Sequence, residues 1–193
     1  MEWLENFWQI YSNLVLTIGI NALLALSIWL TLSCGLLAMA NAAFMGIGAY
    51  AAAILTMNYG APFPLALAGG IAAPALVALL IGGPTLRLSG VYLAMATLGF
   101  GEVVRVLILN AESLTGGALG LNGIPQLTQW WHVVAGLVAT LLILWRLRRS
   151  RLGRAFEAIK EDAVAASLMG IGVNAHKMLA FALGAAIVAS RAR

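Results

Sequence analysis

The sequence predicts an all-α membrane protein, a polytopic helical bundle with about five membrane spans and a partial sixth. Of the 193 residues, 62% are hydrophobic and only 9% are charged, whereas a soluble domain carries about 25% charged residues. No charged residue occurs between Glu5 and Arg87, and residues 146–162 hold nine of the 18 charged residues. Because a soluble chain this poor in charge lacks polar surface to cover its core, the long apolar stretches are interpreted as membrane spans.

Each expected span is an apolar run of roughly 20 residues, the length that crosses a bilayer. The runs are bounded by Gly and Pro, which interrupt regular structure, as in Asn58-Tyr59-Gly60-Ala61-Pro62 and Gly82-Gly83-Pro84. The predicted spans cover residues 13–33, 36–57, 63–83, 91–109 and 130–145. A sixth apolar stretch, residues 178–189, is too short to span well.

The distribution of Lys and Arg predicts the orientation of the spans, because cytoplasmic loops carry an excess of positive charge. If residues 146–160 are cytoplasmic, counting back places Arg87 inside and residues 58–62 and 110–129 outside. The acidic, aromatic N-terminal segment is then outside. Every basic residue between spans falls on one side, so the assignment is self-consistent.

Small residues in the second and third spans predict close helix packing. Ala66 and Gly70, and likewise Gly69 and Ala73, lie four residues apart. Such pairs let helix backbones approach closely in lipid, where packing rather than hydrophobicity drives association.

The sequence contains no signature of an enzyme or of a metal site. It has neither a G-x-x-x-x-G-K-[ST] phosphate loop nor an H-E-x-x-H pair, so we expect no ATP hydrolysis by the chain itself and no bound cofactor. His132 and His176 lie far apart near span ends, and a zinc site needs three or four ligands. Cys34, the only cysteine, is expected to be a small membrane-buried residue. The basic residues cluster beside a span end, a pattern typical of membrane topology and not of nucleic-acid binding.

The charged segment, residues 146–162, has helical periodicity. Leu152, Phe156 and Ile159 form one apolar stripe, and Arg154 and Lys160 are each three residues from Glu157, so both are placed to pair with it. Three interpretations remain open: a solvated loop next to the membrane, a patch that binds anionic lipid, and a docking helix for a cytoplasmic partner.

Glu102 and Arg105 lie inside the fourth predicted span. Ionisable groups within a span are costly and normally face a bundle interior or a water-filled cavity. At a spacing of three they share a helix face. They are therefore candidates either for lining a solute path or for a structural ion pair.

The predicted outer loop contains Leu114–Pro125, LTGGALGLNGIP, with the candidate residues Thr115, Gly116, Gly117 and Gly120. Its glycines and proline exclude a regular span. It is interpreted either as a connection or as a surface over the pore mouth that receives an external partner.

Four segments together resemble the LivM-type permease subunits of branched-chain amino-acid ABC importers. They are NAAFMGIGAY from Asn41, RLSGVYLAMATLGFGEVVR from Arg87, LTGGALGLNGIP from Leu114, and LGRAFEAIKEDAVAASLMGIG from Leu152. They occur in the family's order. Related urea-importer permeases share much of this pattern. In the last segment Val164 stands where ABC permeases often carry an acidic residue.

The resemblance implies one transmembrane permease domain over residues 1–193, in the bacterial inner membrane, with a cytoplasmic coupling loop at residues 146–172. Implied partners are membrane lipid, a second permease subunit, two cytoplasmic ATP-binding subunits, an external solute-binding protein and a small amino-acid solute, with no nucleic acid. Family members continue through further spans, so the chain is expected to be incomplete at its C-terminus. The residues expected to couple to the ATPase are Gly153, Arg154, Glu157, Glu161, Asp162, Ala165, Ala166 and Gly170.

The leading functional hypothesis is therefore a permease subunit that carries branched-chain amino acids and catalyses no reaction. A urea or amide importer permease is an alternative, and so is a truncated, non-transporting fragment or assembly partner. A channel or secondary transporter that works without any ATPase is a further alternative.

Overall fold

The computed structural model describes residues 2–60, 62–117, 120 and 130–189, and this part of the chain is helical without a β-strand. The helices in chain order are α1 (Glu2–Ser33), α2 (Asn41–Tyr59), α3 (Phe63–Thr85), α4 (Val91–Asn110), α5 (Glu112–Thr115), α6 (Trp130–Arg149), α7 (Arg151–Glu161), α8 (Ala163–Leu168) and α9 (Val173–Ala189). The chain is thus the predicted membrane helical bundle.

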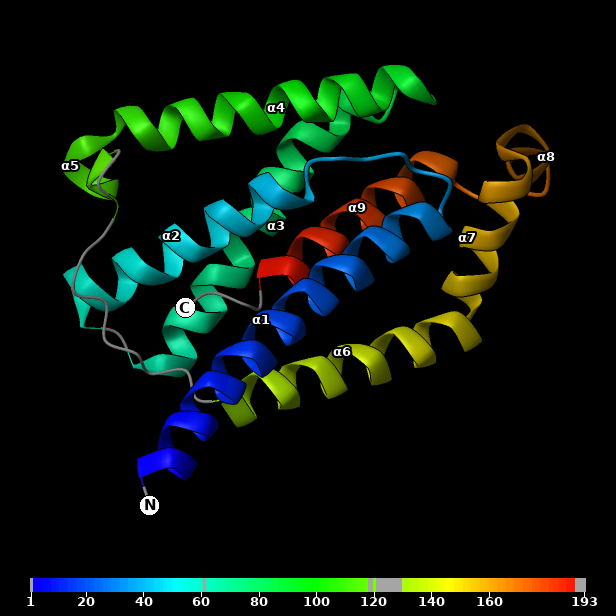
Figure 1. Ribbon diagram of the computed structural model, residues 1–193. Helices are drawn as coiled ribbons and strands as arrows, with labels where there is room; N and C mark the ends of the chain where they lie inside the picture. The colour runs from blue at the N-terminus through cyan, green and yellow to red at the C-terminus, as the bar shows by residue number, and fades with distance from the viewer. Residues whose placement is uncertain (1, 61, 118–119, 121–129, 190–193) are drawn as a thin grey trace.

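Helix α9 lies at the centre of the bundle and packs against α1, α2 and α3 (Figure 1). Its buried face includes Phe181, which meets Phe44 of α2 edge-on at a ring-centroid distance of 5.2 Å. Phe44 also contacts Phe100 of α4 at 5.7 Å. The last helix, expected to be a marginal partial span, therefore packs against three others.

Small residues set how closely these helices approach. A Cβ added to Gly48 of α2 would lie 2.8 Å from the Cβ of Ala189 and 2.9 Å from the carbonyl oxygen of Gly70, so α2, α3 and α9 meet there almost backbone to backbone. On the other side of α9, the Ser27 hydroxyl of α1 donates a buried 2.8 Å hydrogen bond to the carbonyl of Gly184. The close packing that the spacing of Ala66 and Gly70 predicted is confirmed, since both are buried.

The connections separate into two ends of the molecule (Figure 1). The α1–α2 and α3–α4 connections, α7, α8 and the start of α9 lie at one end, on the right of the view. The end of α2, the start of α3 and α5 lie at the other. Arg87 and residues 146–160 are consequently at the same end, as the charge pattern predicted.

The second predicted span starts too early. Residues 36–39 are not helical, and α2 begins only at Asn41. Gly35 has a φ of +72°, in the left-handed region that favours glycine, and the backbone N–H of Met39 donates to Thr97 Oγ1 at 2.9 Å. Thr97 lies about 9 Å along α4, at 1.5 Å per residue, so the extended segment passes beside this helix. Leu36 and Ala38 are buried, whereas Leu37 and Met39 are exposed.

Other helix ends also differ from the prediction. Helix α1 begins at Glu2, whereas the first predicted span begins at residue 13. Helix α3 passes through Pro84 to Thr85, whose hydroxyl donates to the carbonyl of Ile81 at 2.6 Å. Helix α6 continues past residue 145 to Arg149, because basic side chains suit a helix C-terminus. Helix α9 starts at Val173, not at residue 178. Its 17 residues span about 25 Å.

Two helices in the described part are long and apolar enough to cross a membrane, Pro64–Thr85 and Val91–Asn110. Three shorter apolar helices accompany them, Thr17–Ser33, Asn41–Met57 and Val173–Ala189. The length and composition of these helices agree with the predicted membrane helical bundle.

Candidate functional site

Helix α7 carries the charged segment and lies against the end of the bundle. Ser150 caps its N-terminus by accepting from the Gly153 N–H at 3.4 Å. Phe156 and Ile159 are buried, Leu152 is half-buried, and Gly153 is buried beside them. The predicted apolar stripe is confirmed, and the opposite face of the helix is charged.

Gly153 brings α7 into direct contact with α6. A Cβ at this position would lie 2.5 Å from the carbonyl oxygen of Leu147, and 2.6 Å and 2.7 Å from the carbonyl oxygen and Cα of Arg148. These neighbours are backbone atoms that cannot rotate away. The close approach at Gly153 therefore fixes the angle between α6 and α7. Gly153 itself is buried, so other residues form the exposed surface of α7.

The ion pair of Glu157 crosses from one helix to the next. Its carboxylate lies 3.9 Å from Nε of Arg148 on α6. The sequence predicted pairing with Arg154 or Lys160, but within the described residues neither is Glu157's ion-pair partner. The Arg154 guanidinium instead donates to the carbonyl of Arg149 at 3.4 Å. The fold, and not the spacing within α7, selects the partner.

Asp162 separates α7 from α8 and starts the second helix. Its backbone is extended, and its carboxylate accepts from the N–H groups of Val164 and Ala165 at 2.8 and 3.1 Å, which is the geometry of an N-cap. Gly170, with a φ of +80°, ends α8, where the Ile171 N–H donates to the Ala166 carbonyl at 3.1 Å. The segment is thus two helices with a corner at Asp162.

The described candidate coupling residues divide by exposure. Gly153 and Ala166 are buried and hold α7 and α8 in place, whereas the others are exposed. The exposed ones are Arg154, Glu157, Glu161, Asp162, Ala165 and Gly170.

Helix α8 also exposes three large apolar side chains. Val164 is 70% exposed, Leu168 83% and Met169 84%. The helix lies at the outermost point of the end that carries the basic residues (Figure 1). Exposed apolar side chains that gather on one surface mark a site of interaction with another protein or with a membrane. We call α7, α8 and the C-cap residue Met169, together residues 151–169, the coupling hairpin.

Glu102 and Arg105 form the predicted ion pair on α4. Their side chains approach to 3.6 Å, and each is 72% exposed. Neither faces the interior of this chain's bundle. Helix α4 contacts its neighbours sparsely, and large apolar residues around the pair are also exposed, among them Met95, Leu98 and Val106.

The described part of the outer loop is ordered by Thr115. The Thr115 hydroxyl donates to the carbonyl of Ile108 at 2.6 Å and lies 2.9 Å from that of Ala111, while the Gly117 N–H donates back to it at 3.2 Å. Gly116, Gly117 and Gly120 all have positive φ angles. Thr115 is thus buried as the centre of a tight turn after α5. Residues 118–119 and 121–125 of the predicted loop lie outside the described residues.

Sequence reasoning missed Asn41, the first residue of α2. Its side chain is 2% exposed, and within the described residues neither amide atom has a hydrogen-bond partner. Burying an amide without a partner costs about 1–3 kcal/mol, so the position calls for an explanation beyond packing. The available signal was the single amide in residues 22–57.

The described part of the chain contains no group of side chains suited to bind a metal ion. Among the described residues, no three His, Cys, Asp or Glu side chains gather closely enough to hold an ion. Cys34 is fully buried, as expected. The ring of His176 packs edge-on against Phe156 at 6.3 Å.

Comparison with known proteins links this architecture to transport. Residues 10–189 match the family described as branched-chain amino acid transport system / permease component. The chain is 36% identical to the high-affinity branched-chain amino acid transport system permease protein LivM of Salmonella typhimurium and to that of Escherichia coli, over 90% of this chain and 47% of each relative. It is 28% identical to the autoinducer 2 import system permease protein LsrC of an Enterobacter species, over 70% of this chain and 41% of that protein.

The chain spans about half the length of the curated relatives it matches. No solved structure matches it significantly.

Proposed function

Because the chain belongs to the family of permease components of branched-chain amino acid transport systems, we propose that it is a transmembrane subunit of an ABC importer for branched-chain amino acids. It lies in the bacterial inner membrane with the coupling hairpin in the cytoplasm and the start of α1 outside. It catalyses no reaction and binds no cofactor. Two ATP-binding subunits supply the energy, and a second permease subunit and an external solute-binding protein complete the importer.

The observation that carries the proposal is the coupling hairpin. It is held to the bundle by Gly153, Phe156 and Ile159 on one side and presents Leu168 and Met169 to the outside on the other. A part that is rigidly connected to the membrane helices and apolar at its tip can transmit movement of a bound ATPase. Coupling requires that the hairpin contact the ATPase differently in its two states.

The exposed ion pair on α4 supports a second permease subunit. Glu102 is the twelfth of 20 residues in this helix, about 17 Å from its start at 1.5 Å per residue, and therefore near the middle of the bilayer. A charged side chain there costs about 2.5–3.5 kcal/mol against lipid. Covering α4 with a second permease, or with a water-filled path between the two subunits, removes that cost. Glu102 and Arg105 then line the translocation path.

The outer turn around Thr115 lies at the end opposite the hairpin (Figure 1). In the proposed orientation this end faces the solute-binding protein. The tight turn of Gly116 and Gly117 gives that partner a shaped surface, which a flexible connection would not provide.

The test is uptake of labelled leucine into vesicles that contain this chain together with its second permease and ATP-binding subunits. Uptake should require ATP, the binding protein and this chain. Unchanged uptake without this chain would show a non-transporting protein, and uptake without any ATPase would show a channel or secondary transporter. Competition by isoleucine, valine or urea identifies the solute class.

The hairpin is tested in the same vesicles with Leu168→Ser/Met169→Ser. Both side chains are more than 80% exposed, so stability should change by less than about 0.5 kcal/mol, while transport-coupled ATP hydrolysis should fall severalfold. Leu88→Ser is the control, because Leu88 is an exposed apolar residue of the α3–α4 connection at the same end. Equal losses in both variants would contradict a specific role for α8.

A further inference from the structure

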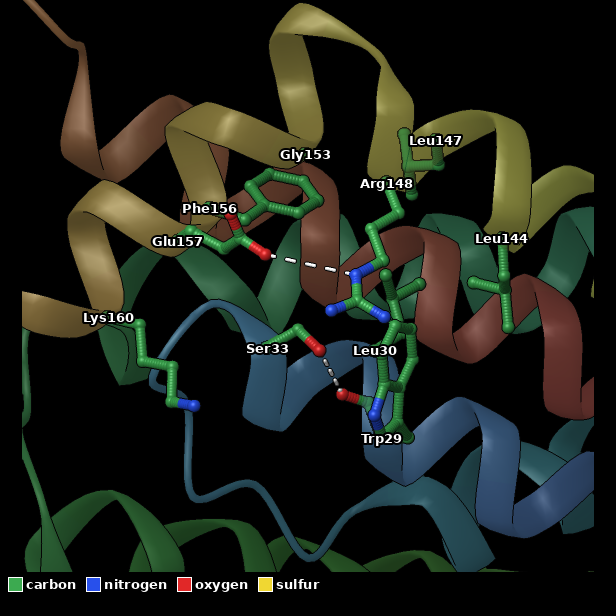
Figure 2. A pocket seen from close by; sticks show the side chains of 10 residues that line it. All are labelled: Trp29, Leu30, Ser33, Leu144, Leu147, Arg148, Gly153, Phe156, Glu157 and Lys160. Carbon is green, nitrogen blue, oxygen red and sulfur yellow. Dashed lines mark hydrogen bonds and ion pairs between the residues drawn. The ribbon is translucent and has the colours of Figure 1, made fainter.

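We propose that a pocket between α1, α6 and α7 binds the phosphate headgroup of an anionic phospholipid. The pocket has a volume of about 210 Å³ and lies where the last turns of α1 and α6 meet the inner face of α7 (Figure 2). The inference goes beyond the transport function, since it concerns a lipid and not the solute.

The pocket exists because α1 and α6 touch at one end and separate toward the other. A Cβ on Gly19 would lie 2.7 Å from Val133 Cγ1, so the two helices are in close contact there. Toward their C-terminal ends they diverge, and α7 lies across the opening (Figure 1). Because Gly153 fixes α7 against α6, the wedge between the helices stays partly open.

Two cations reach the pocket from different helices. Arg148 comes from α6 and Lys160 from the last turn of α7 (Figure 2). The 3.9 Å separation between Arg148 and Glu157 is well beyond the roughly 2.7–2.9 Å of a charge-assisted hydrogen bond. Arg148 therefore keeps donors for another anion. Lys160 has no ion-pair partner within the described part of the chain. A phosphate group has several acceptor oxygens, so it can accept hydrogen bonds from donors on both helices.

The remaining walls are those of a membrane interface. Trp29, Leu30 and Leu144 line the apolar side of the pocket, and the Ser33 hydroxyl lies near the rim, bonded to the Trp29 carbonyl at 2.8 Å. Tryptophan is enriched at the level of lipid headgroups. At the same helix end, the Arg149 guanidinium stacks over the Trp145 ring at 4.2 Å.

The pocket's surroundings favour a lipid over a free anion. Trp29 is 43% exposed and its neighbour Leu32 42% exposed, so an apolar surface continues from the pocket along α1 and can take acyl chains. Residues 146–162 hold six basic and three acidic side chains, a net charge of +3 that attracts anionic headgroups. Basic pockets between membrane helices on the cytoplasmic side are recognised lipid sites.

Lipid binding would act on the coupling hairpin through Glu157. A phosphate on Arg148 displaces the weak pair with Glu157 and links α6 to Lys160 of α7 instead. The bound lipid then sets how firmly α7 is held to the bundle. This gives the Arg148–Glu157 pair a function beyond that of an ordinary surface ion pair, which contributes little to stability.

The test titrates the purified 193-residue chain in detergent with phosphatidylglycerol, or with phosphatidylcholine of the same acyl chains, and counts bound lipids by native mass spectrometry. Wild type should prefer phosphatidylglycerol. Arg148→Gln/Lys160→Gln should weaken its binding about 25-fold, at roughly fivefold for each cation near the membrane surface. Arg151→Gln/Arg154→Gln removes the same charge outside the pocket and should weaken binding less than threefold.

A second pair of variants tests for stronger phosphatidylglycerol binding, a change that misfolding would not produce. Glu157→Gln should strengthen phosphatidylglycerol binding severalfold, because it releases Arg148 and removes a like charge from the phosphate. Glu161→Gln, with the same charge change on an exposed position outside the pocket, should not.

Three results would overturn the proposal. If Arg148→Gln/Lys160→Gln and Arg151→Gln/Arg154→Gln lose the same affinity for phosphatidylglycerol, binding depends on diffuse surface charge and not on the pocket. Displacement of phosphatidylglycerol by an equal concentration of inorganic phosphate would show a simple anion site. Unchanged lipid binding together with loss of ATP-binding subunit association in Arg148→Gln/Lys160→Gln would assign the pocket to the protein interface.

Discussion

Replacing Gly153 with alanine tests whether the coupling hairpin is held rigidly to the membrane helices. The new Cβ would lie 2.5–2.7 Å from backbone atoms of Leu147 and Arg148. Ordinary contacts are about 3.5–4.0 Å, so α7 must move by about 1 Å. Overpacking of this kind costs about 1–3 kcal/mol, and the higher helix propensity of alanine returns about 1 kcal/mol. The net loss is therefore about 0–2 kcal/mol.

Thermal unfolding of the detergent-solubilised chain measures that loss. A chain of this size should lose about 2–4 °C in Tm for each kcal/mol. Transport-coupled ATP hydrolysis should fall more steeply than stability, because the displaced α7 carries α8 with it. Gly136→Ala is the matched control: Gly136 lies within α6, and an added Cβ there has no neighbour within 4 Å. If Gly153→Ala is as stable and as active as Gly136→Ala, α7 is not pressed against α6 and the reasoning fails.

Three further variants or measurements probe the α4 face and the core. Glu102→Gln leaves Arg105 unpaired, so co-purification of the second permease should fall. The fall should be smaller in Glu102→Gln/Arg105→Gln, where no lone charge remains. Equal effects of the two variants would contradict an ion pair covered by a partner. Cys34 is fully buried, so maleimide should modify it only after unfolding in detergent, and rapid labelling of the folded chain would refute its placement. Ser27→Ala loses the buried hydrogen bond to Gly184 and should lower stability by about 0.5–1.5 kcal/mol, measured as Tm; an unchanged Tm would show that α1 and α9 do not meet there.

The positions of most helices could be predicted from the sequence because the bilayer sets their length. The apolar run from residue 63 and the one from residue 91 became α3 and α4 with the same first residues. Both are bounded by residues with strong local preferences: Pro62 before α3, and Gly90, with a φ of +58°, before α4. Where local preference and membrane length agree, sequence reasoning suffices.

The non-helical segment before α2 could not be predicted, because tertiary contacts determine it. Residues 36–40 read LLAMA, an apolar run that favours a continued helix. In the structure these residues are instead extended beside α4, where the Met39 N–H donates a hydrogen bond to the Thr97 hydroxyl. That partner lies 58 positions along the chain, so no local sequence pattern predicts it. The same segment leads into Asn41, whose buried, unpaired amide sequence reasoning also missed.

The apolar face of α7 could be predicted from the sequence, but the arrangement of α6, α7 and α8 relative to one another could not. The apolar stripe of α7 follows from helical periodicity, which depends only on the spacing of Phe156 and Ile159. The ion pair of Glu157 depends on how α6 and α7 cross, and that angle is set by the close approach at Gly153. Likewise, the exposure of Leu168 and Met169 follows from the corner at Asp162, which directs α8 away from the bundle.

Cross-linking from the tip of the coupling hairpin to the ATP-binding subunit tests whether the hairpin contacts that subunit. In the assembled importer, Met169→Cys should form an adduct with that subunit through a short bifunctional thiol reagent, with a yield that changes when ATP is added. Leu88→Cys, at the same end but on the α3–α4 connection, is the control and should give little adduct. Buried Cys34 keeps the background low. A hairpin that transmits movement of the ATPase should give an ATP-dependent adduct at position 169. No adduct there, or an equal adduct at position 88, would show that the hairpin does not make that contact.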